Sequence, residues 1–264
     1  MCRGKGYVPA SQAGALVADF AVTWLNRTAN TPHRLWVAIG VNNAGNMTTA
    51  NAQVWAIARF LARQAVSDNL RAFFVGAIDA EVEWNTAVTT RAWIDAYMND
   101  SHGCTPGDGV NACLYNFGNA NCGYTATNEN CGHPSWNPDW AKDSIWYISA
   151  GAKRVNDQYP FVAALPEIYN TVGAQARQWQ SVSLYGAITP SKRKVYFVGA
   201  LTTLGACDQV DPLPRAPASQ GGCLGIDNAP PVGYLQLYNE LTTDSRTTQS
   251  PIWWSTDIKY QVFP

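Results

Sequence analysis

The sequence predicts an α/β fold, and its most economical form is one (β/α)8 TIM-barrel-like domain over residues 1–264. Short apolar runs rich in β-formers recur, and several precede apolar residues at helical spacing. The runs before Asp79 and Glu167 are continuously apolar, as in parallel strands that helices cover. Seven or eight strand candidates in 264 residues fit one barrel better than two domains.

The first helical pattern covers residues 13–25, and no convincing strand precedes it, so an incomplete or irregular first strand is expected. Strand 35–41 leads to a helix over 54–65, and strand 72–78 to a helix over 86–98. Asn85 or Thr86 is the expected N-cap of the latter helix. The other predicted strands are 113–117, 145–149, 161–165, 182–185, 195–201 and 252–258.

Composition excludes some classes of function. The 18 Lys and Arg residues against 19 Asp and Glu give a net charge of −1, so nucleic acid is disfavoured as a partner. The longest apolar run is far shorter than the ~20 residues of a membrane span. The start of the chain lacks the pattern of a signal peptide, so a trimmed or incomplete N-terminus is expected. Eleven Trp and twelve Tyr indicate a neutral, stacking ligand or a Trp-rich core.

Seven cysteines point to an oxidising compartment. None forms a C-x-x-C pair, and the middle four are nine residues apart in Gly- and Asn-rich sequence. Pairing of neighbours, 104–113, 122–131 and 207–223, would leave Cys2 single, although crossed pairs or free thiols are alternatives. The six cysteines expected in disulfides are Cys104, Cys113, Cys122, Cys131, Cys207 and Cys223. The predicted location is extracellular.

Two carboxylates leave one predicted strand on the same side. Asp79 and Glu81 are two residues apart, and side chains alternate faces along a strand. Two neighbouring carboxyl groups resist double ionisation, which raises one pKa and prepares a general acid. Glycosidic-bond cleavage requires such an acid and a second carboxylate. Glu83 shares this parity but lies past the strand, and the alternative role of the pair is capping and solvation.

The ends of other predicted strands carry further candidates. Glu167 follows an apolar run and is expected as the second carboxylate, or as a residue that pairs with Lys or Arg. Polar and aromatic groups at strand ends suit sugar hydroxyls, and tryptophans offer faces for stacking. The candidates for substrate binding are Asn42, Asn43, Tyr115, Asn116, Tyr147, Trp84, Trp146 and Trp179.

Other chemistries have less support. His33, His102 and His133 are too few and too scattered for a metal cage, so no metal and no cofactor is predicted. The chain contains no G-x-S-x-G elbow, P-loop or G-x-G-x-x-G motif after a strand.

Several segments resemble a group of secreted bacterial proteins that are classed as glycoside-hydrolase-like barrels. The similarity covers about residues 33–258. It is carried by residues 76–85 (GAIDAEVEWN), 90–97 (TRAWIDAY), 115–118 (YNFG), 145–149 (IWYIS), 165–169 (LPEIY), 177–179 (RQW), 233–239 (GYLQLYN) and 254–258 (WSTDI).

The resemblance implies a TIM-barrel-like fold, secretion and a carbohydrate ligand. It also likens Asp79-Ala80-Glu81 to the D-x-E pair of chitinase-like and lysozyme-like barrels, in which the Glu is the acid and the Asp its helper. This chain departs from the longer D-x-x-D-x-D-x-E signature of chitinases, because glycine and apolar residues precede Asp79.

Two hypotheses follow. The first is a secreted glycoside hydrolase that acts on a polysaccharide or cell-wall glycan, with Glu81 as acid, Asp79 as its modulator and Glu167 as second carboxylate or substrate-binding residue. The second is a non-catalytic barrel that binds glycans or serves a structural role outside the cell. The incomplete signature and the doubtful first strand favour the second. The substrate, the anomeric outcome and the oligomeric state stay open.

Overall fold

A computed structural model describes residues 8–66, 71–103, 112–127, 130–131, 139–153, 162–211 and 213–258 of the chain. Within these ranges the fold is α/β, as predicted. The elements in chain order are α1 (Ala10–Arg27), β1 (Leu35–Asn42), α2 (Thr49–Ala65), β2 (Ala72–Asp79), α3 (Ala87–Asn99), β3 (Leu114–Asn116), α4 (Lys142–Trp146), the π-helical turn η1 (Tyr147–Gly151), β4 (Val162–Ala164), α5 (Ala174–Ile188), β5 (Gly199–Thr202), α6 (Leu204–Val210), the 3₁₀ turn η2 (Ala218–Gln220), α7 (Pro230–Thr242) and β6 (Trp254–Asp257).

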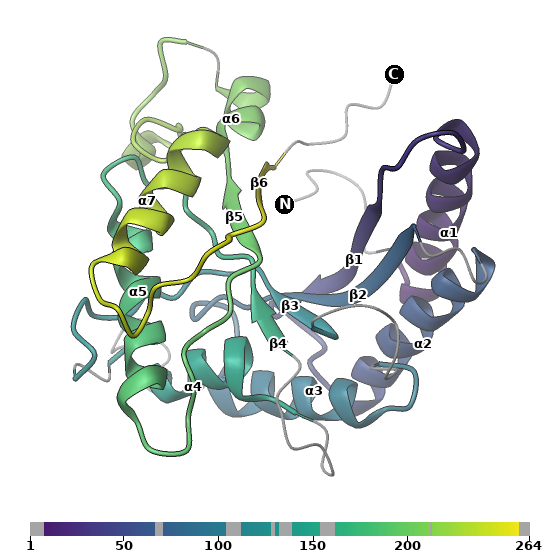
Figure 1. Cartoon of the computed structure of the whole chain (residues 1–264), viewed down its shortest axis with the longest axis horizontal. Coiled ribbons are helices and arrows are strands. Elements are labelled where there is room, and N and C mark those ends of the chain that lie inside the picture. Colours follow the sequence, from purple (N-terminus) through teal and green to yellow (C-terminus); the bar gives the residue numbers. More distant parts are fainter. Residues whose placement is uncertain are drawn as a thin grey trace.

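All strand pairs are parallel and follow the order of the chain. One sheet has the order β1-β2-β3-β4, and β5 pairs with β6 in a second sheet. Two isolated parallel bridges, Ala164 with Phe197 and Glu167 with Leu201, join the sheets. The described ranges hold six strands, so the closed eight-stranded barrel of the prediction is not observed. Helices surround the strands on their outer side (Figure 1).

The strands separate two apolar layers. Phe74 and Ile78 of β2 belong to the large core between the strands and the helices. The alternate residue Val75 packs with Tyr115 and Val198 in a smaller cluster on the opposite, concave side. Side chains that follow β2 at the parity of Val75 therefore emerge on the concave side.

The predicted helices are confirmed, with α1, α2 and α3 at the expected places. Thr86 caps α3, because its hydroxyl accepts a hydrogen bond of 3.1 Å from the backbone N–H of Thr89. The predicted strands within 35–41, 72–78, 113–117, 161–165, 195–201 and 252–258 correspond to β1 to β6, with shorter bounds for most.

Two predicted strands are wrong. Residues 145–149 form the end of α4 and most of η1, and residues 182–185 lie inside α5. A short apolar run has no periodicity that separates a strand from a buried helix. In α5 the buried residues Ala176, Trp179, Val182 and Gly186 recur at helical spacing, and this packing outweighs the β-propensity of Val182 and Tyr185.

Disulfides fix two of the long loops. Cys122 bonds to Cys131 and Cys207 to Cys223, which confirms two of the three predicted pairs. Cys113 is also disulfide-bonded, whereas its predicted partner Cys104 lies outside the described residues, as does Cys2.

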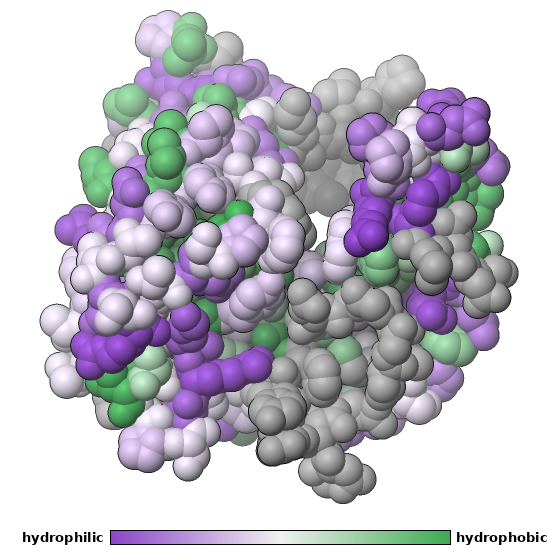
Figure 2. Space-filling view, in the orientation of Figure 1, coloured by the Kyte–Doolittle hydropathy of each residue, from purple (hydrophilic) through white to green (hydrophobic). Residues whose placement is uncertain are grey.

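No described helix combines the length and the apolar character that crossing a bilayer requires. The visible surface is mixed in hydropathy, and it is hollowed between the part around α5–α7 and the part around α1 (Figure 2).

Candidate functional site

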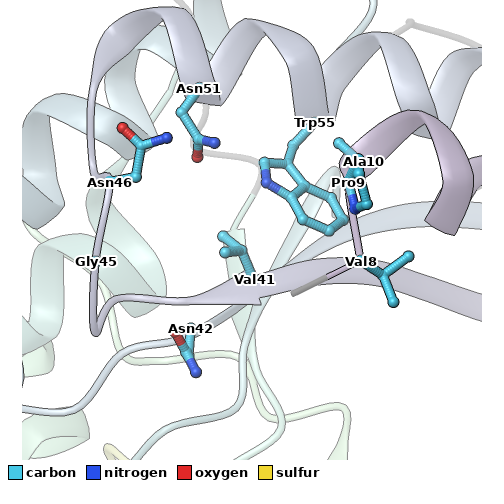
Figure 3. Close-up of a pocket in the computed structure, with 9 residues that line it drawn as sticks. All are labelled: Val8, Pro9, Ala10, Val41, Asn42, Gly45, Asn46, Asn51 and Trp55. Carbon is cyan, nitrogen blue, oxygen red and sulfur yellow. The ribbon is translucent and has the colours of Figure 1, made fainter. Parts of the chain in front are cut away.

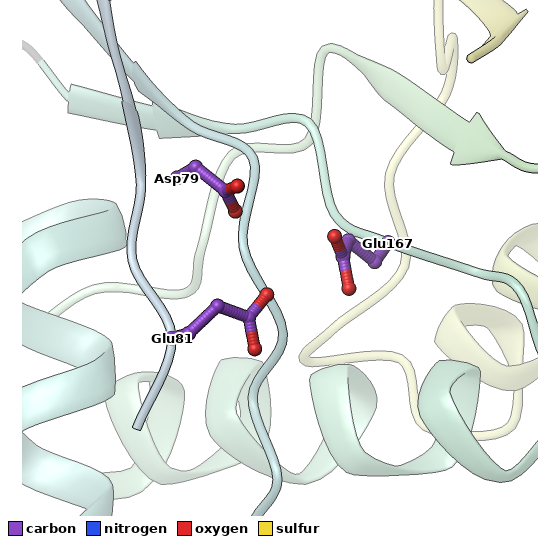
Figure 4. Close-up of side chains that lie close together, drawn as sticks. All are labelled: Asp79, Glu81 and Glu167. Atoms are coloured by element: carbon purple, nitrogen blue, oxygen red, sulfur yellow. The ribbon is translucent and has the colours of Figure 1, made fainter. Parts of the chain in front are cut away.

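Three carboxylates meet at the carboxyl ends of the strands. Asp79 is the last residue of β2, Glu81 follows two residues later, and Glu167 comes three residues after β4. The side chains point toward one another (Figure 4), and one oxygen from each lies within 4.8 Å of the other two. Glu81 is buried, and Asp79 and Glu167 are partly exposed. We call these three residues the carboxylate trio.

The backbone of Glu81 is fixed from β1. The buried side chain of Asn43 accepts a hydrogen bond of 2.9 Å from the N–H of Glu81 and donates one of 2.9 Å to its carbonyl. Its Nδ2 also contacts Thr90 of α3 at 3.2 Å. Asn43 was predicted to bind substrate, but its side chain instead fixes the backbone of Glu81.

The loop after β3 holds the carboxyl group of Glu81. The Nδ2 group of Asn119 donates a hydrogen bond to Glu81 Oε2. Gly118 brings this loop close, because a Cβ atom there would lie 2.2 Å from the carbonyl oxygen of Ala80. The same loop reaches the exposed Glu83, whose Oε1 accepts a hydrogen bond of 2.8 Å from Asn121 Nδ2.

A second set of contacts holds Glu167. The Tyr169 hydroxyl donates a hydrogen bond of 2.7 Å to Glu167 Oε1. The backbone N–H groups of Tyr169 and Asn170 both donate to the side-chain oxygen of Gln175, at 2.6 and 2.8 Å. The segment after β4 is therefore tied to the start of α5.

Burial raises the pKa of each carboxyl group in the trio, and the charges of neighbouring carboxylates raise the pKa of Glu81 and Glu167 further. Burial raises the pKa of Asp79 to about 6. Burial, and then the charges of Glu167, Asp79 and Glu83, raise the pKa of Glu81 far above its ordinary value. The pKa of Glu167 is raised mainly by burial, which the hydrogen bond from Tyr169 partly offsets. Carboxyl groups that keep a proton at neutral pH can act as general acids.

Two oxygens beside Glu81 lack a hydrogen-bond partner among the described residues. They are Asp79 Oδ1 and Asn119 Oδ1, and both are buried. A buried acceptor without a donor costs free energy, so each of them can take a donor from a ligand.

Several predicted substrate-binding residues lie elsewhere, which corrects the prediction. Trp179 is fully buried and meets Phe197 edge to face, so it offers no face to a sugar. The Nε1 of buried Trp146 donates to the carbonyl of Arg193, and the Tyr147 hydroxyl donates to Asp95 of α3. Trp146 and Tyr147 lie in α4 and η1, where a strand was predicted, and Trp179 lies in α5.

Two other candidates serve the fold on the strands. Tyr115 is buried in the concave cluster below the carboxylates, and burial raises its pKa to about 12. Asn116 donates a hydrogen bond of 2.9 Å to Ser149 Oγ and accepts one of 3.1 Å from the N–H of Gly118. Asn116 therefore shapes the turn that leads to Asn119.

Asn42 and Trp84 keep access to solvent. Asn42 pairs in register with Asp79 and shares its concave face, and Trp84 is 36% exposed. Asn42 also borders a cavity of about 430 Å³ whose wall includes Val41, Trp55 and Asn51. Its side chain points to the opposite side of β1 from Trp55 (Figure 3), so this cavity lies on the helix side and the trio on the concave side.

The trio is the one described group of acidic, histidine and cysteine side chains compact enough to surround a metal ion. Oxygen ligands of this kind suit Mg²⁺ or Ca²⁺. The same carboxyl groups can instead share protons. His33 and His102 lie outside the trio, and His133 lies outside the described residues.

No family model, curated protein or solved structure matches the chain. The assignment of a function therefore depends on the geometry of the site. Sequence reasoning brought Asp79, Glu81 and Glu167 forward and overlooked Asn119 and Tyr169. Tyr169 had a usable signal, since it lies two residues after Glu167 and therefore at the same parity in an extended segment.

Proposed function

We propose that the chain is a glycoside hydrolase that acts on a polysaccharide or cell-wall glycan by carboxylate acid/base catalysis. The observation that supports this is the convergence of Asp79, Glu81 and Glu167 within 4.8 Å, in a setting that raises all three pKa values. Cleavage of a glycosidic bond requires a protonated acid beside an ionised carboxylate. In this proposal Glu81 is the acid and Glu167 is the carboxylate.

Glu81 is the proposed general acid. It is the most buried member of the trio, and it donates its proton to the glycosidic oxygen as the bond to the anomeric carbon breaks. Glu167, which follows β4, attacks that carbon in its ionised form, and Asp79 modulates the proton on Glu81. Because burial raises the pKa of Glu167 to about 8, the ionised fraction grows as pH rises above neutral. Water then displaces Glu167 while Glu81 takes back a proton. The short spacing favours this retaining route, for which carboxyl groups stand about 5–5.5 Å apart, over inversion at about 6.5–9.5 Å.

The proposal includes a barrel-like arrangement and an extracellular location. Six parallel strands in chain order with helices outside support a (β/α) barrel over a doubly wound sheet, whose strand order reverses. The disulfides Cys122–Cys131 and Cys207–Cys223 support an oxidising compartment.

The experiment compares wild type, Glu81→Gln and Glu83→Gln on soluble peptidoglycan fragments, chitin oligosaccharides and β-glucans. We expect wild type to release reducing ends and Glu81→Gln to lose at least about 10²-fold of that rate, with a melting temperature that is unchanged or higher. Glu83→Gln removes an exposed carboxylate from the same segment and is the control. Full activity of Glu81→Gln would refute the assignment.

The products and a chelator resolve two further questions. Retention of the anomeric configuration, followed by NMR during turnover, is expected from the spacing of the trio. Activity that disappears with EDTA and returns with Mg²⁺ or Ca²⁺ would instead assign the trio to a metal. Saturable glycan binding without hydrolysis would support the non-catalytic alternative.

A further inference from the structure

The three carboxyl groups of the trio accept hydrogen bonds from only two described side chains outside it, Asn119 and Tyr169. One oxygen each of Asp79, Glu81 and Glu167 lies within 4.8 Å of the other two, and among the described residues no lysine or arginine is a main influence on their ionisation. Three adjacent carboxylates cannot all ionise at neutral pH without strong repulsion, so they share protons and titrate as a coupled group.

The two glutamates differ in the donor that each receives. Asn119 donates its side-chain N–H to Glu81 Oε2, and Tyr169 donates its hydroxyl to Glu167 Oε1 at 2.7 Å. A hydrogen bond given to a carboxylate favours its ionised form. Each donor therefore tends to move the shared proton away from its own glutamate and toward the other.

We propose that Asn119 and Tyr169 are opposing positioning residues that decide which of Glu81 and Glu167 holds the shared proton. Neither needs to touch the reacting atoms. Under the proposed function, the hydrogen bond from Tyr169 favours the ionised Glu167 that attacks, and Asn119 limits how tightly Glu81 holds the proton that it must give up. The proton distribution itself does not depend on a substrate.

The charges of the other acidic groups around the pair do not supply this asymmetry. Asp79 and Glu83, from the end of β2 and the turn after it, raise the pKa of both glutamates. Tyr169, from the segment after β4, has its own pKa raised by burial and by Glu167, so it stays protonated and remains a donor. Within the trio, side-chain hydrogen bonds with Glu81 lower the pKa of Asp79 and of Glu167, which favours the proton on Glu81. Asn119 and Tyr169 are the described side-chain donors from outside the trio, and each of them acts on one glutamate.

The test is practicable because the chain contains few glutamates. The sequence holds five, at positions 81, 83, 129, 167 and 240, so protein labelled with [δ-¹³C]glutamate gives five carboxyl resonances. Glu81→Gln and Glu167→Gln assign two of them. The resonances are followed from pH 4 to 11 in the full chain with EDTA present.

Opposite responses are expected from two variants. In Asn119→Ala, Glu81 should titrate about one pH unit higher, a tenfold gain in proton affinity, and Glu167 should titrate lower. In Tyr169→Phe, Glu167 should titrate higher and Glu81 lower. A backbone hydrogen bond from Asn119 to Glu81 is kept in the first variant, so only the side-chain contribution is removed.

Asn121→Ala is the matched control, since it removes the same kind of amide from the same loop but contacts Glu83. It should leave Glu81 and Glu167 unchanged. Asn119→Gln, which keeps the amide, should restore the behaviour of Glu81 at least in part. If Asn119→Ala does not fold, Tyr169→Phe alone still tests the opposed shifts.

Unchanged titrations in Asn119→Ala and Tyr169→Phe, or shifts of both glutamates in the same direction in both variants, would overturn the inference. Loss of activity in Glu81→Gln would then still support the hydrolase. Conversely, opposed shifts in a protein that cleaves no glycan would sustain the inference and refute the proposed function.

Discussion

At the scale of single residues, the trio places acidic groups where they reduce the stability of the fold. Burial raises the pKa of Asp79 from 3.8 to about 6. Between these pH values the folded protein binds more protons than the unfolded chain, so stability must fall as pH rises through this window. Retaining such a group at a stability cost is typical of sites selected for chemistry.

Asp79→Asn should therefore stabilise the protein at pH 7.5 and have little effect at pH 3.5, where both states are protonated. The expected gain is about 3 kcal/mol, since burial raises the pKa of Asp79 from 3.8 to about 6 and one pKa unit corresponds to about 1.4 kcal/mol. Urea denaturation at the two pH values measures it. Asp19→Asn on the exposed side of α1 is the control, and an equal gain there would contradict the explanation.

Individual residues also show where sequence reasoning succeeds. The parity of Asp79 and Glu81 after an apolar strand correctly predicts that their side chains lie together. The role of Asn43 could not be predicted, because its three contacts are to Glu81 and Thr90, which are close only after β1, β2 and α3 have packed. An asparagine that follows a strand can hydrogen-bond to a ligand or to a neighbouring backbone segment, and the sequence does not distinguish the two roles.

At the scale of elements, the loop after β3 is the part that completes the site. It crosses the end of β2 at Gly118, where the two backbones nearly touch, and it then delivers Asn119 to Glu81. Long strands and helices were predictable from periodicity, whereas this loop has no periodic pattern. The short strands and the α4–η1 segment were harder still, because three to five apolar residues fit either kind of structure.

Gly118→Ala tests this close approach. A Cβ atom would lie 2.2 Å from the carbonyl oxygen of Ala80, and backbone atoms cannot yield as a flexible side chain does. We expect a loss of about 2 kcal/mol or more in unfolding free energy and a larger loss of activity. Thermal and urea unfolding measure the first. Gly45→Ala, where no heavy atom lies within 4 Å of the added Cβ, should be close to neutral.

At the scale of the whole molecule, disulfides replace regular structure in the long loops. The Cys207–Cys223 bond closes a separation of 16 residues between α6 and the start of the segment before α7. Removing it as Cys207→Ser with Cys223→Ser should cost about 3 kcal/mol by the loop-entropy relation. Denaturant titration of the double variant measures this, and an unchanged midpoint would show that the crosslink does not constrain the unfolded chain.

The junction between the two sheets has a consequence for motion. The β1–β4 sheet and the β5–β6 pair are joined by isolated bridges, and one of these is formed by Glu167 itself with Leu201. Asp79 ends β2 of the first sheet, Glu81 follows it, and Glu167 follows β4 of the same sheet. A small hinge-like opening along this seam would leave nearly all of the secondary structure intact and yet break the bridge that holds the backbone of Glu167 from the β5 side. Such opening would increase the rate of amide hydrogen exchange near Leu201. The geometry of the carboxylate trio therefore depends on the isolated bridges between the two sheets.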